Sequence, residues 1–232
     1  NIININPINN IAVIGAGTMG AGIAQWFAIK GHKVLIKDIS TQQISNGLKN
    51  IGKLLIDGVL KYKFDRSTAK AAMGRISTSH VDVPLKDKEL VLEVIAENFD
   101  LKTKVLKEIE SNISSNTILA TNTSALSITE LAAELDRPEK FIGIHFFNPV
   151  HKMKLVEIVV GEKTSEVTIA RVVKFVKSIG KLPVVVKDSP GFLVNRILLP
   201  YLGKAIELSI LGVDIEQIDK AMIKFGMPMG DR

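Results

Sequence analysis

A glycine-rich turn follows directly on an apolar run near the start of the sequence. Residues 11–14, Ile-Ala-Val-Ile, lead into Gly15-Ala16-Gly17-Thr18-Met19-Gly20, and a helical pattern continues to Lys30. In such a turn the first glycine permits a sharp bend, the second lets the backbone approach a pyrophosphate, and the third allows close packing of helix on strand. The helix start offers N–H groups and partial positive charge to phosphates. The segment predicts a dinucleotide site that includes Gly15, Gly17, Met19 and Gly20.

An acidic residue at the end of the next apolar run indicates which dinucleotide is bound. Asp38 follows residues 33–37 and lies about 20 residues beyond the glycines, the distance typical of a ribose-binding acid. Its carboxylate would accept hydrogen bonds from the adenosine 2′-hydroxyl and repel a 2′-phosphate. The sequence therefore favours NAD over NADP, although the neighbouring cation Lys37 would soften that repulsion. The alternative is an ordinary tight turn followed by a surface aspartate.

Apolar runs alternate with helical patterns along most of the sequence. This alternation predicts an α/β fold with a Rossmann-type, doubly wound, mainly parallel sheet. Several runs lack polar alternation, as is typical of strands that helices cover on both faces. The expected strands are residues 11–14, 33–37, 90–95, 117–121, 141–145, 155–160 and 182–187.

Helical spacing and capping residues mark the segments between the strands. Residues 40–61 carry apolar side chains at spacings of three and four. A further helix is expected after Asn98, and Ser127 followed by Glu130 predicts one that begins at Ile128. Glycines at 31, 180 and 212 stand where helices should end.

The pattern changes after Asp188, and no strand-like run returns. Pro190 and Gly191 are expected to open a long helix that reaches about Leu211, and Asp214 is expected to cap another. The sequence predicts a dinucleotide-binding domain at 1–188 and the beginning of a helical C-terminal domain at 189–232.

Composition excludes several classes of protein and of site. The sequence has no cysteine and only four histidines, so neither a disulfide framework nor a metal site is expected. A net charge of +6 fits either a phosphate-bearing partner or a lysine-rich solvated surface. Aromatic residues make up 5%, without a basic stripe, so nucleic-acid binding is not expected. No run approaches the ~18 apolar residues of a membrane span, residues 1–10 lack a signal pattern, and the cytoplasm is the expected compartment.

The segment with most chemical information is His145-Phe146-Phe147-Asn148-Pro149, at the end of an expected strand. Ligands of such folds bind at the carboxyl edge of the sheet. Glu157 lies within the next apolar run and needs a partner, because burying an unpaired charge is costly. His145 is the natural candidate, and the pair could take a proton from a substrate hydroxyl. The alternative is a structural histidine that caps the strand.

Two other segments place polar groups at the same edge. Thr121-Asn122-Thr123-Ser124 follows a strand and could bind substrate or nicotinamide, or could be a simple turn cluster. Asn195 lies on the first helix after the domain boundary, where it could face the cleft or satisfy a backbone group.

Taken together, these motifs resemble the L-3-hydroxyacyl-CoA dehydrogenase family over nearly the whole sequence from Ile11 to Gly230. The motifs that carry the resemblance are Gly15-Ala16-Gly17-Thr18-Met19-Gly20, Asn122-Thr123-Ser124, His145-Phe146-Phe147-Asn148-Pro149, Met153-Lys154-Leu155-Val156-Glu157 and Pro190-Gly191-Phe192-x-x-Asn195-Arg196. The resemblance implies NAD-dependent oxidation of L-3-hydroxyacyl-CoA to 3-ketoacyl-CoA, or the reverse reduction.

The resemblance also implies a role for each matching position. His145 matches the general base, Glu157 its paired carboxylate, and Ser124 and Asn195 the residues that hold the substrate near the base. Glu97, Lys102, Asn122 and Asn148 match positions on the nicotinamide side of the cofactor and in the active-site loop. Lys49, matched by spacing alone, lies where members contact the phosphates of coenzyme A, and a solvated surface lysine is the equal alternative.

The resemblance implies assembly as well. Family members continue past Met227-Pro228-Met229-Gly230 through further helices that form much of a dimer interface, so this sequence is expected to stop within that domain and the full-length protein to be a homodimer. Lys37-Asp38 also resembles the multifunctional fatty-acid oxidation proteins, in which an enoyl-CoA hydratase precedes the dehydrogenase. The rival functions are a dehydrogenase of a small hydroxy acid and a non-catalytic, crystallin-like NAD-binding relative.

Overall fold

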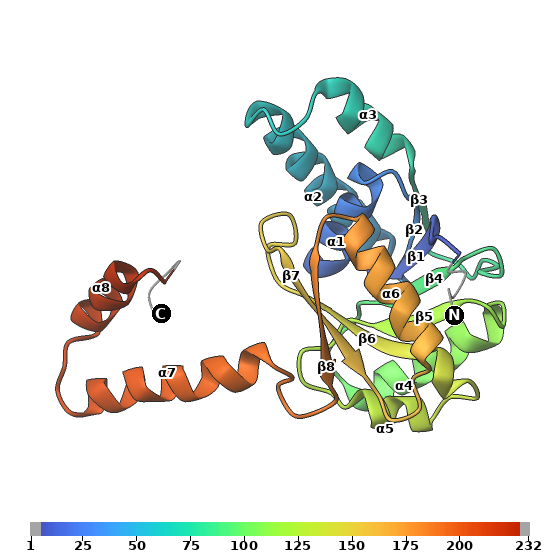
Figure 1. Ribbon diagram of the computed structural model, residues 1–232. Helices are drawn as coiled ribbons and strands as arrows, with labels where there is room; N and C mark the ends of the chain where they lie inside the picture. Colours follow the sequence, from blue (N-terminus) through green and yellow to red (C-terminus); the bar gives the residue numbers. More distant parts are fainter. Residues whose placement is uncertain (1–5, 228–232) are drawn as a thin grey trace. The chain divides into compact units, whose positions relative to one another are not determined.

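The computed structural model describes residues 6–227 of the chain. The chain folds into two compact units, with the division between Ser189 and Pro190. The first unit is an α/β domain and the second consists of two helices (Figure 1).

One eight-stranded sheet forms the centre of the first unit, in the order β3-β2-β1-β4-β5-β6-β7-β8. β1 to β6 are mutually parallel, whereas β7 is antiparallel to β6 and β8 follows the direction of β7. The predicted doubly wound, mainly parallel Rossmann-type fold is therefore confirmed. The strands are β1 (Asn10–Ile14), β2 (Lys33–Lys37), β3 (Ile76–Ser79), β4 (Leu90–Glu93), β5 (Ile118–Thr121), β6 (Phe141–Phe146), β7 (Leu155–Val160) and β8 (Leu182–Lys187).

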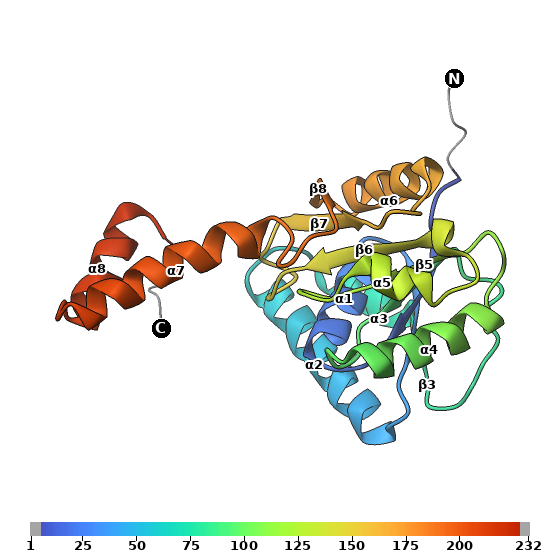
Figure 2. The same cartoon turned by 90° about the horizontal axis from the view of Figure 1, so that it is seen from below.

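Helices cover the sheet on both faces. Figure 2 shows α6 on one side of β6 and β7, and α4 and α5 on the other. α1 and α6 share a face, since the rings of Phe27 and Phe175 pack edge to face with centroids 5.2 Å apart. The helices of this unit are α1 (Thr18–Ile29), α2 (Thr41–Leu60), α3 (Arg66–Gly74), α4 (Phe99–Asn112), α5 (Ile128–Ala133), the short 3₁₀ turn Pro138–Lys140 and α6 (Glu166–Ser178).

Side-chain caps fix where several of these helices begin. Ser40, Asn98 and Ser127 each accept a hydrogen bond from the backbone N–H three residues later. A cap of this kind satisfies one of the amides that the first helical turn leaves unpaired. The starts of α2, α4 and α5 therefore agree with the sequence prediction.

The predicted strand at 90–95 is shorter in the structure, because β4 ends at Glu93. The carboxylate of Glu93 accepts a hydrogen bond from the amide of Ile95 at 2.6 Å, which turns the chain away from the sheet. The predictions also missed α3 and β3. β3 has the sequence Ile-Ser-Thr-Ser and lies at the sheet edge, with none of its residues fully buried, so its sequence has no apolar run.

The second unit contains α7 (Val194–Ile210) and α8 (Ile215–Phe225). The prediction that a helix opens at Pro190 and Gly191 is wrong. Gly191 and Phe192 have φ of +74° and +52°, left-handed values that a right-handed helix cannot contain, so α7 begins only at Val194. Asp214 caps α8 as expected. Pro228, Met229 and Gly230 of the family-like turn lie outside the described residues.

Two further findings concern residues 6–227 as a whole. Within that range no helix has both the length and the hydropathy required for a membrane span. The same range contains no group of three or more His, Asp or Glu side chains arranged to hold a metal ion.

Candidate active site

The glycine-rich turn joins β1 to α1 at the carboxyl edge of the sheet. Gly15 has φ of +113°, and a Cβ built there would lie 2.4 Å from the carbonyl oxygen of Val94. A Cβ on Gly20 would lie 1.9 Å from the carbonyl oxygen of Gly15. Neither position accepts a side chain, because the backbone of the neighbouring segment already occupies the space.

Gly17 differs from its neighbours, since a Cβ built there meets no heavy atom within 4 Å. It is also the N-cap of α1, and no side chain caps this helix. The first turn of α1 therefore presents its amides to open space, as a pyrophosphate requires. Met19 lies in that turn and packs partly buried against the core. These features fit a dinucleotide, and a side chain at Gly17 would fill the space.

Asp38 lies beside the turn, where β2 ends. Its Oδ2 accepts a hydrogen bond from the amide of Ala16 at 2.9 Å, and its Oδ1 accepts one from the amide of Ser40 at 3.0 Å. Lys37 forms an ion pair of 2.5 Å with Asp82, so its charge has a partner other than Asp38. Next to Asp38 is a hollow of about 420 Å³, lined by Gly15, Gly17, Asp38, Gln43, Ile95 and Leu101 among others. This hollow fits the adenosine end of the cofactor.

His145 and Glu157 are register partners on β6 and β7. Nδ1 of His145 lies 2.7 Å from Oε2 of Glu157, and the two side chains are 8% and 1% exposed. The partnership expected from the sequence is therefore present. The ring of Phe147 packs on the imidazole with centroids 4.4 Å apart. Because Nδ1 is bonded to a buried carboxylate, the ring is held in one orientation and an imidazolium would be stabilised.

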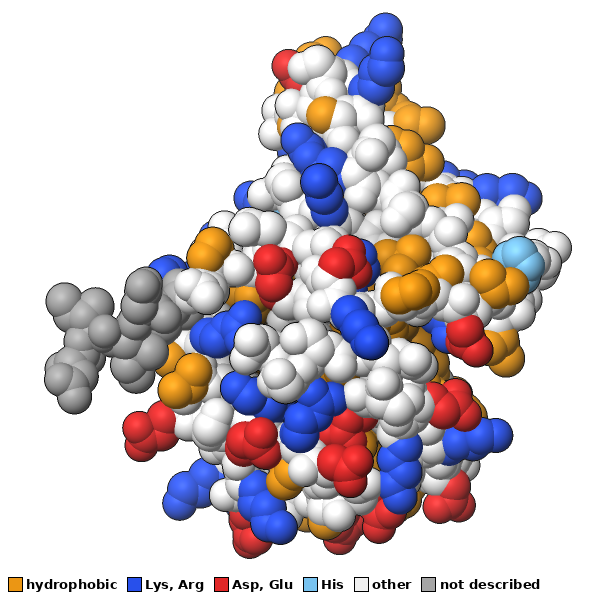
Figure 3. All heavy atoms as spheres, turned by 90° about the vertical axis from the view of Figure 1, so that its right-hand side faces the viewer, with side chains coloured by type: hydrophobic (Ala, Val, Ile, Leu, Met, Phe, Trp, Pro, Cys, Tyr) orange, Lys and Arg blue, Asp and Glu red, His pale blue; other side chains and the backbone are white. Residues whose placement is uncertain are grey.

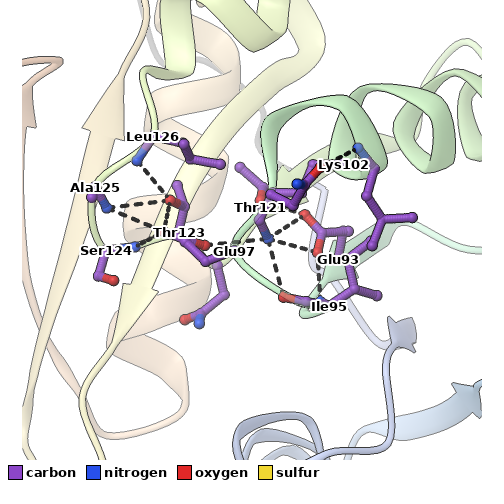
Figure 4. A network of polar contacts seen from close by, with 12 residues as sticks. Glu93, Ile95, Glu97, Lys102, Thr121, Thr123, Ser124, Ala125 and Leu126 are labelled. Carbon is purple, nitrogen blue, oxygen red and sulfur yellow. Dashed lines mark hydrogen bonds and ion pairs between the residues drawn. The ribbon is translucent and has the colours of Figure 1, made fainter.

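A buried ion pair, Glu93–Lys102, lies at the carboxyl edge of the sheet (Figure 4). Nζ of Lys102 is 2.8 Å and 3.0 Å from the two carboxylate oxygens of Glu93, and both side chains are 0% exposed. Glu93 also accepts hydrogen bonds from the hydroxyl of Thr121 at 2.5 Å and from the amide of Ile95. The carboxylate is thus fully hydrogen-bonded, which is what a buried charge requires.

Glu97 connects this ion pair to the turn that carries Ser124 (Figure 4). Its Oε2 lies 3.7 Å from Nζ of Lys102. Its Oε1 accepts hydrogen bonds from the hydroxyl of Thr123 and from the amide of Ser124 at 3.0 Å. The Ser124 turn is therefore held by a carboxylate that itself faces a buried cation. The resemblance places Lys102 on the nicotinamide side of the cofactor, but in this structure its side chain is 0% exposed and Glu97 lies between its ammonium group and the turn.

Asn122, which follows β5, forms hydrogen bonds with the last residues of β4 and β6. Its amide donates to the carbonyl of Glu93 at 2.8 Å, and its Oδ1 accepts from the amide of Phe146 at 2.9 Å. The last residues of β4 and β6 are thereby held against the residue that follows β5, and His145 directly precedes Phe146. Asn148 lies exposed in the loop between β6 and β7.

Two other predicted site residues lie on the helices α2 and α7. Lys49 is exposed on α2. The upper projection in Figure 3 is formed by α2 and α3 and carries several basic side chains, whereas basic and acidic side chains are interspersed over the lower part of that face. Asn195 lies in the first turn of α7, in the second unit.

The sequence reasoning missed Glu93. The signal was available, since Glu93 lies in the apolar run Leu-Val-Leu-Glu, as Glu157 lies in Leu-Val-Glu-Ile-Val-Val. The argument that a buried glutamate needs a partner applies equally to both. It also missed Lys181, a buried lysine directly before β8, because no pattern in the sequence indicated that this side chain is buried.

Two family models match the chain. The model described as "3-hydroxyacyl-CoA dehydrogenase, NAD binding domain" matches residues 10–189, and the model of the C-terminal domain of the same family matches residues 191–231. Together they span both units of the structure.

The chain is also similar to longer curated proteins. The fatty acid oxidation complex subunit alpha of Acinetobacter baumannii (strain SDF) is 47% identical over 225 residues, which are 97% of this chain and 31% of that protein. The chain thus spans about a third of the length of such relatives.

Solved structures show the same similarity. The (S)-3-hydroxybutyryl-CoA dehydrogenase of Ralstonia eutropha superimposes with a TM-score of 0.92 at 42% identity, covering 97% of this chain and 80% of that one. The 3-hydroxybutyryl-CoA dehydrogenase of Escherichia coli K12 gives a TM-score of 0.92 at 36% identity, covering 97% of this chain and 48% of that one.

Proposed function

The chain belongs to the 3-hydroxyacyl-CoA dehydrogenase family, and from this we propose that it catalyses the NAD-dependent oxidation of L-3-hydroxyacyl-CoA to 3-ketoacyl-CoA. The observation that carries the proposal is the His145–Glu157 pair at the carboxyl edge of the sheet. That edge also carries the glycine-rich turn and Asp38, which supports a base and a dinucleotide site within one unit.

In this proposal His145 is the general base. Glu157 holds Nδ1, so the substrate hydroxyl would give its proton to Nε2 as the C3–O bond becomes a carbonyl. NAD⁺, held by the glycine-rich turn and Asp38, would supply the acceptor for the hydride of C3. Glu157 stabilises the positive charge that develops on the imidazole, because the two groups are buried and 2.7 Å apart.

Ser124 and Asn195 are proposed to hold the substrate near His145. The amide of Ser124 is fixed by Glu97, and Glu97 faces Lys102, which supports a role for this turn in orienting the reacting hydroxyl. Asn122 and Asn148 are proposed to line the nicotinamide side together with Glu97. Lys49, exposed on α2, is proposed to meet a phosphate of coenzyme A.

We also propose that the chain acts as the dehydrogenase part of a longer fatty-acid oxidation protein. The name of the relatives from Acinetobacter, subunit alpha of a fatty acid oxidation complex, supports this assembly. A homodimer and a cytoplasmic location remain expectations from the sequence.

The test follows NADH absorbance with NAD⁺ and four compounds: L-3-hydroxybutyryl-CoA, a longer L-3-hydroxyacyl-CoA, the D-isomer and free 3-hydroxybutyrate. Oxidation of either L-acyl-CoA, without response to the other two compounds, is the expected result. Oxidation of the free acid at an equal rate would identify a dehydrogenase of small hydroxy acids. NADH binding without turnover of any compound would instead support a non-catalytic relative.

A further inference from the structure

Lys181 is a buried lysine in the short connection between α6 and β8. The residue is 4% exposed. Its ammonium group donates hydrogen bonds to the carbonyl oxygen of Met153 at 2.7 Å and to that of Val150. It also lies over the indole of Trp26, 4.0 Å from the ring centroid.

These contacts are unusual for a buried cation. Among the described residues, the partners of Lys181 are two carbonyls and an aromatic ring, and none of them is a carboxylate. Taking a charge out of water without a counter-charge is costly. The hydrogen bonds of an ionised donor are, however, about twice as strong as neutral ones. The cation therefore fixes the two carbonyls firmly.

Both carbonyls belong to residues 147–154, the loop that joins β6 to β7. This loop connects the strand of His145 to the strand of Glu157 and contains Asn148. Val150 is buried, and a Cβ on Gly22 of α1 would lie 3.4 Å from its Cγ2, so the loop packs on the helix that follows the glycine-rich turn. Trp26 of the same helix donates to the carbonyl of Ile179 at 3.0 Å. Lys181 therefore lies where the loop, α1 and the end of α6 meet.

We propose that Lys181 is a positioning residue of the dehydrogenase site, which holds the β6–β7 loop against α1 so that His145, Glu157 and Asn148 keep the geometry needed for the reaction. The inference rests on the proposed function. Lys181 acts through the loop, because its contacts are with loop carbonyls and with Trp26.

The charge of Lys181 depends on pH near the physiological range. Burial, and then the charge of Lys30 at the C-terminal cap of α1, lower the pKa of Lys181 to about 8. His151 of the loop is titratable as well; burial, and then the charges of Lys63, Lys152 and Lys181, lower its pKa. With a pKa of about 8, the ammonium group of Lys181 is mainly a cation at lower pH and mainly a neutral amine at higher pH, so the loop is held most firmly on the acid side.

The test compares Lys181→Met and Lys181→Arg with Lys30→Met in the intact protein. Lys30 is the matched control, since its Nζ also lies over Trp26, at 4.9 Å, while its side chain makes no hydrogen bond to the loop within the described residues. We expect Lys181→Met to lower kcat/KM at pH 7 by about 10- to 100-fold, the effect of a small displacement of a catalytic group. Lys30→Met should leave kcat/KM at pH 7 unchanged.

The pH profile distinguishes positioning from a general loss of stability. In the wild type, kcat/KM should fall as the pH rises above about 8. This alkaline limb of the pH profile should be absent in Lys181→Arg, because arginine stays charged. Lys30→Met should move the limb to higher pH, because it removes a neighbouring cation. If Lys181→Met does not fold, the other two variants still test the inference. It is overturned if kcat/KM of both Lys30→Met and Lys181→Arg falls at the same alkaline pH as in the wild type.

Hydrogen exchange separates this inference from the proposed function. The amides of Lys152 and Met153 both donate to the carbonyl of Pro149, so their protection reports the loop without any turnover. Faster exchange in Lys181→Met than in Lys30→Met at equal pH is expected. A wild type that oxidises no hydroxyacyl-CoA overturns the proposed function and with it the catalytic role of the loop. Equal exchange and equal kcat/KM in Lys181→Met and wild type overturn the role of Lys181 alone.

Discussion

Nδ1 of His145 lies 2.7 Å from Oε2 of Glu157 because the two residues face each other in the antiparallel pair of β6 and β7. In the described part of the sheet every other neighbouring pair of strands is parallel. The reversal at β7 thus places a carboxylate beside a histidine at the edge where the ligand is expected. Both side chains are carried by strands of the sheet, and the loop of residues 147–154 connects these two strands.

Glu157→Gln tests the carboxylate of this pair. An amide can still meet Nδ1, but it does not stabilise an imidazolium and can bond to the wrong tautomer. We expect kcat to fall by about 10² to 10⁴, the range of general-base catalysis, with NADH binding unchanged. Steady-state kinetics and a fluorescence titration with NADH measure the two quantities. A variant with wild-type kcat would show that Glu157 serves only the packing of β7.

Gly17→Ala and Gly20→Ala form a matched pair within the glycine-rich turn. A Cβ at 17 meets nothing, so the first variant should fold normally and bind NADH at least about tenfold more weakly, a loss of about 1.4 kcal/mol. A Cβ at 20 would lie 1.9 Å from the carbonyl oxygen of Gly15, so the second variant should be less stable by at least about 1–3 kcal/mol. Urea unfolding and NADH titration of both variants test this. Normal NADH affinity in Gly17→Ala would contradict the assigned phosphate site.

Glu93→Gln tests the buried ion pair beneath the Ser124 turn. Removing the carboxylate of Glu93 leaves the buried ammonium of Lys102 with only the more distant carboxylate of Glu97, at 3.7 Å, so the unfolding free energy should fall by up to about 3–5 kcal/mol. The double variant Glu93→Gln/Lys102→Met removes both charges and should regain most of that stability. It should still show reduced kcat, since Glu97 no longer faces a cation. Full kcat in a stable double variant would limit the ion pair to a structural role.

The acid side of the stability curve depends on His32. Burial lowers its pKa below the ordinary value of 6.5, against smaller opposing effects from Ile8 and Glu89. The unfolded chain therefore binds the proton more readily, and stability is lost as the pH falls through 6.5 toward the lower value in the folded state. His32→Gln should flatten this part of the curve, whereas replacement of the exposed His80 should not. Urea unfolding at several pH values provides the measurement, and an unchanged slope in His32→Gln would contradict the account.

Much of the first unit could be predicted because its strands are apolar runs and its helices have capping side chains. β3 could not, since a short, polar edge strand leaves no such pattern. The reversal at β7 was not predicted, although the connection between Phe146 and Leu155 is shorter than the dozen or so residues that a parallel crossover requires. The contacts of Lys181 with loop carbonyls depend on tertiary packing, which residue types alone do not reveal.

The central claim is that His145 accepts the proton of the substrate hydroxyl at a site where NAD binds independently. The most direct measurement compares His145→Gln with the wild type for turnover of L-3-hydroxybutyryl-CoA and, separately, for NADH affinity. The account predicts a fall in kcat of about 10² to 10⁴ with unchanged NADH affinity. Wild-type turnover in His145→Gln would contradict it, because the proposed reaction assigns the proton to His145 and to no other group at this edge of the sheet.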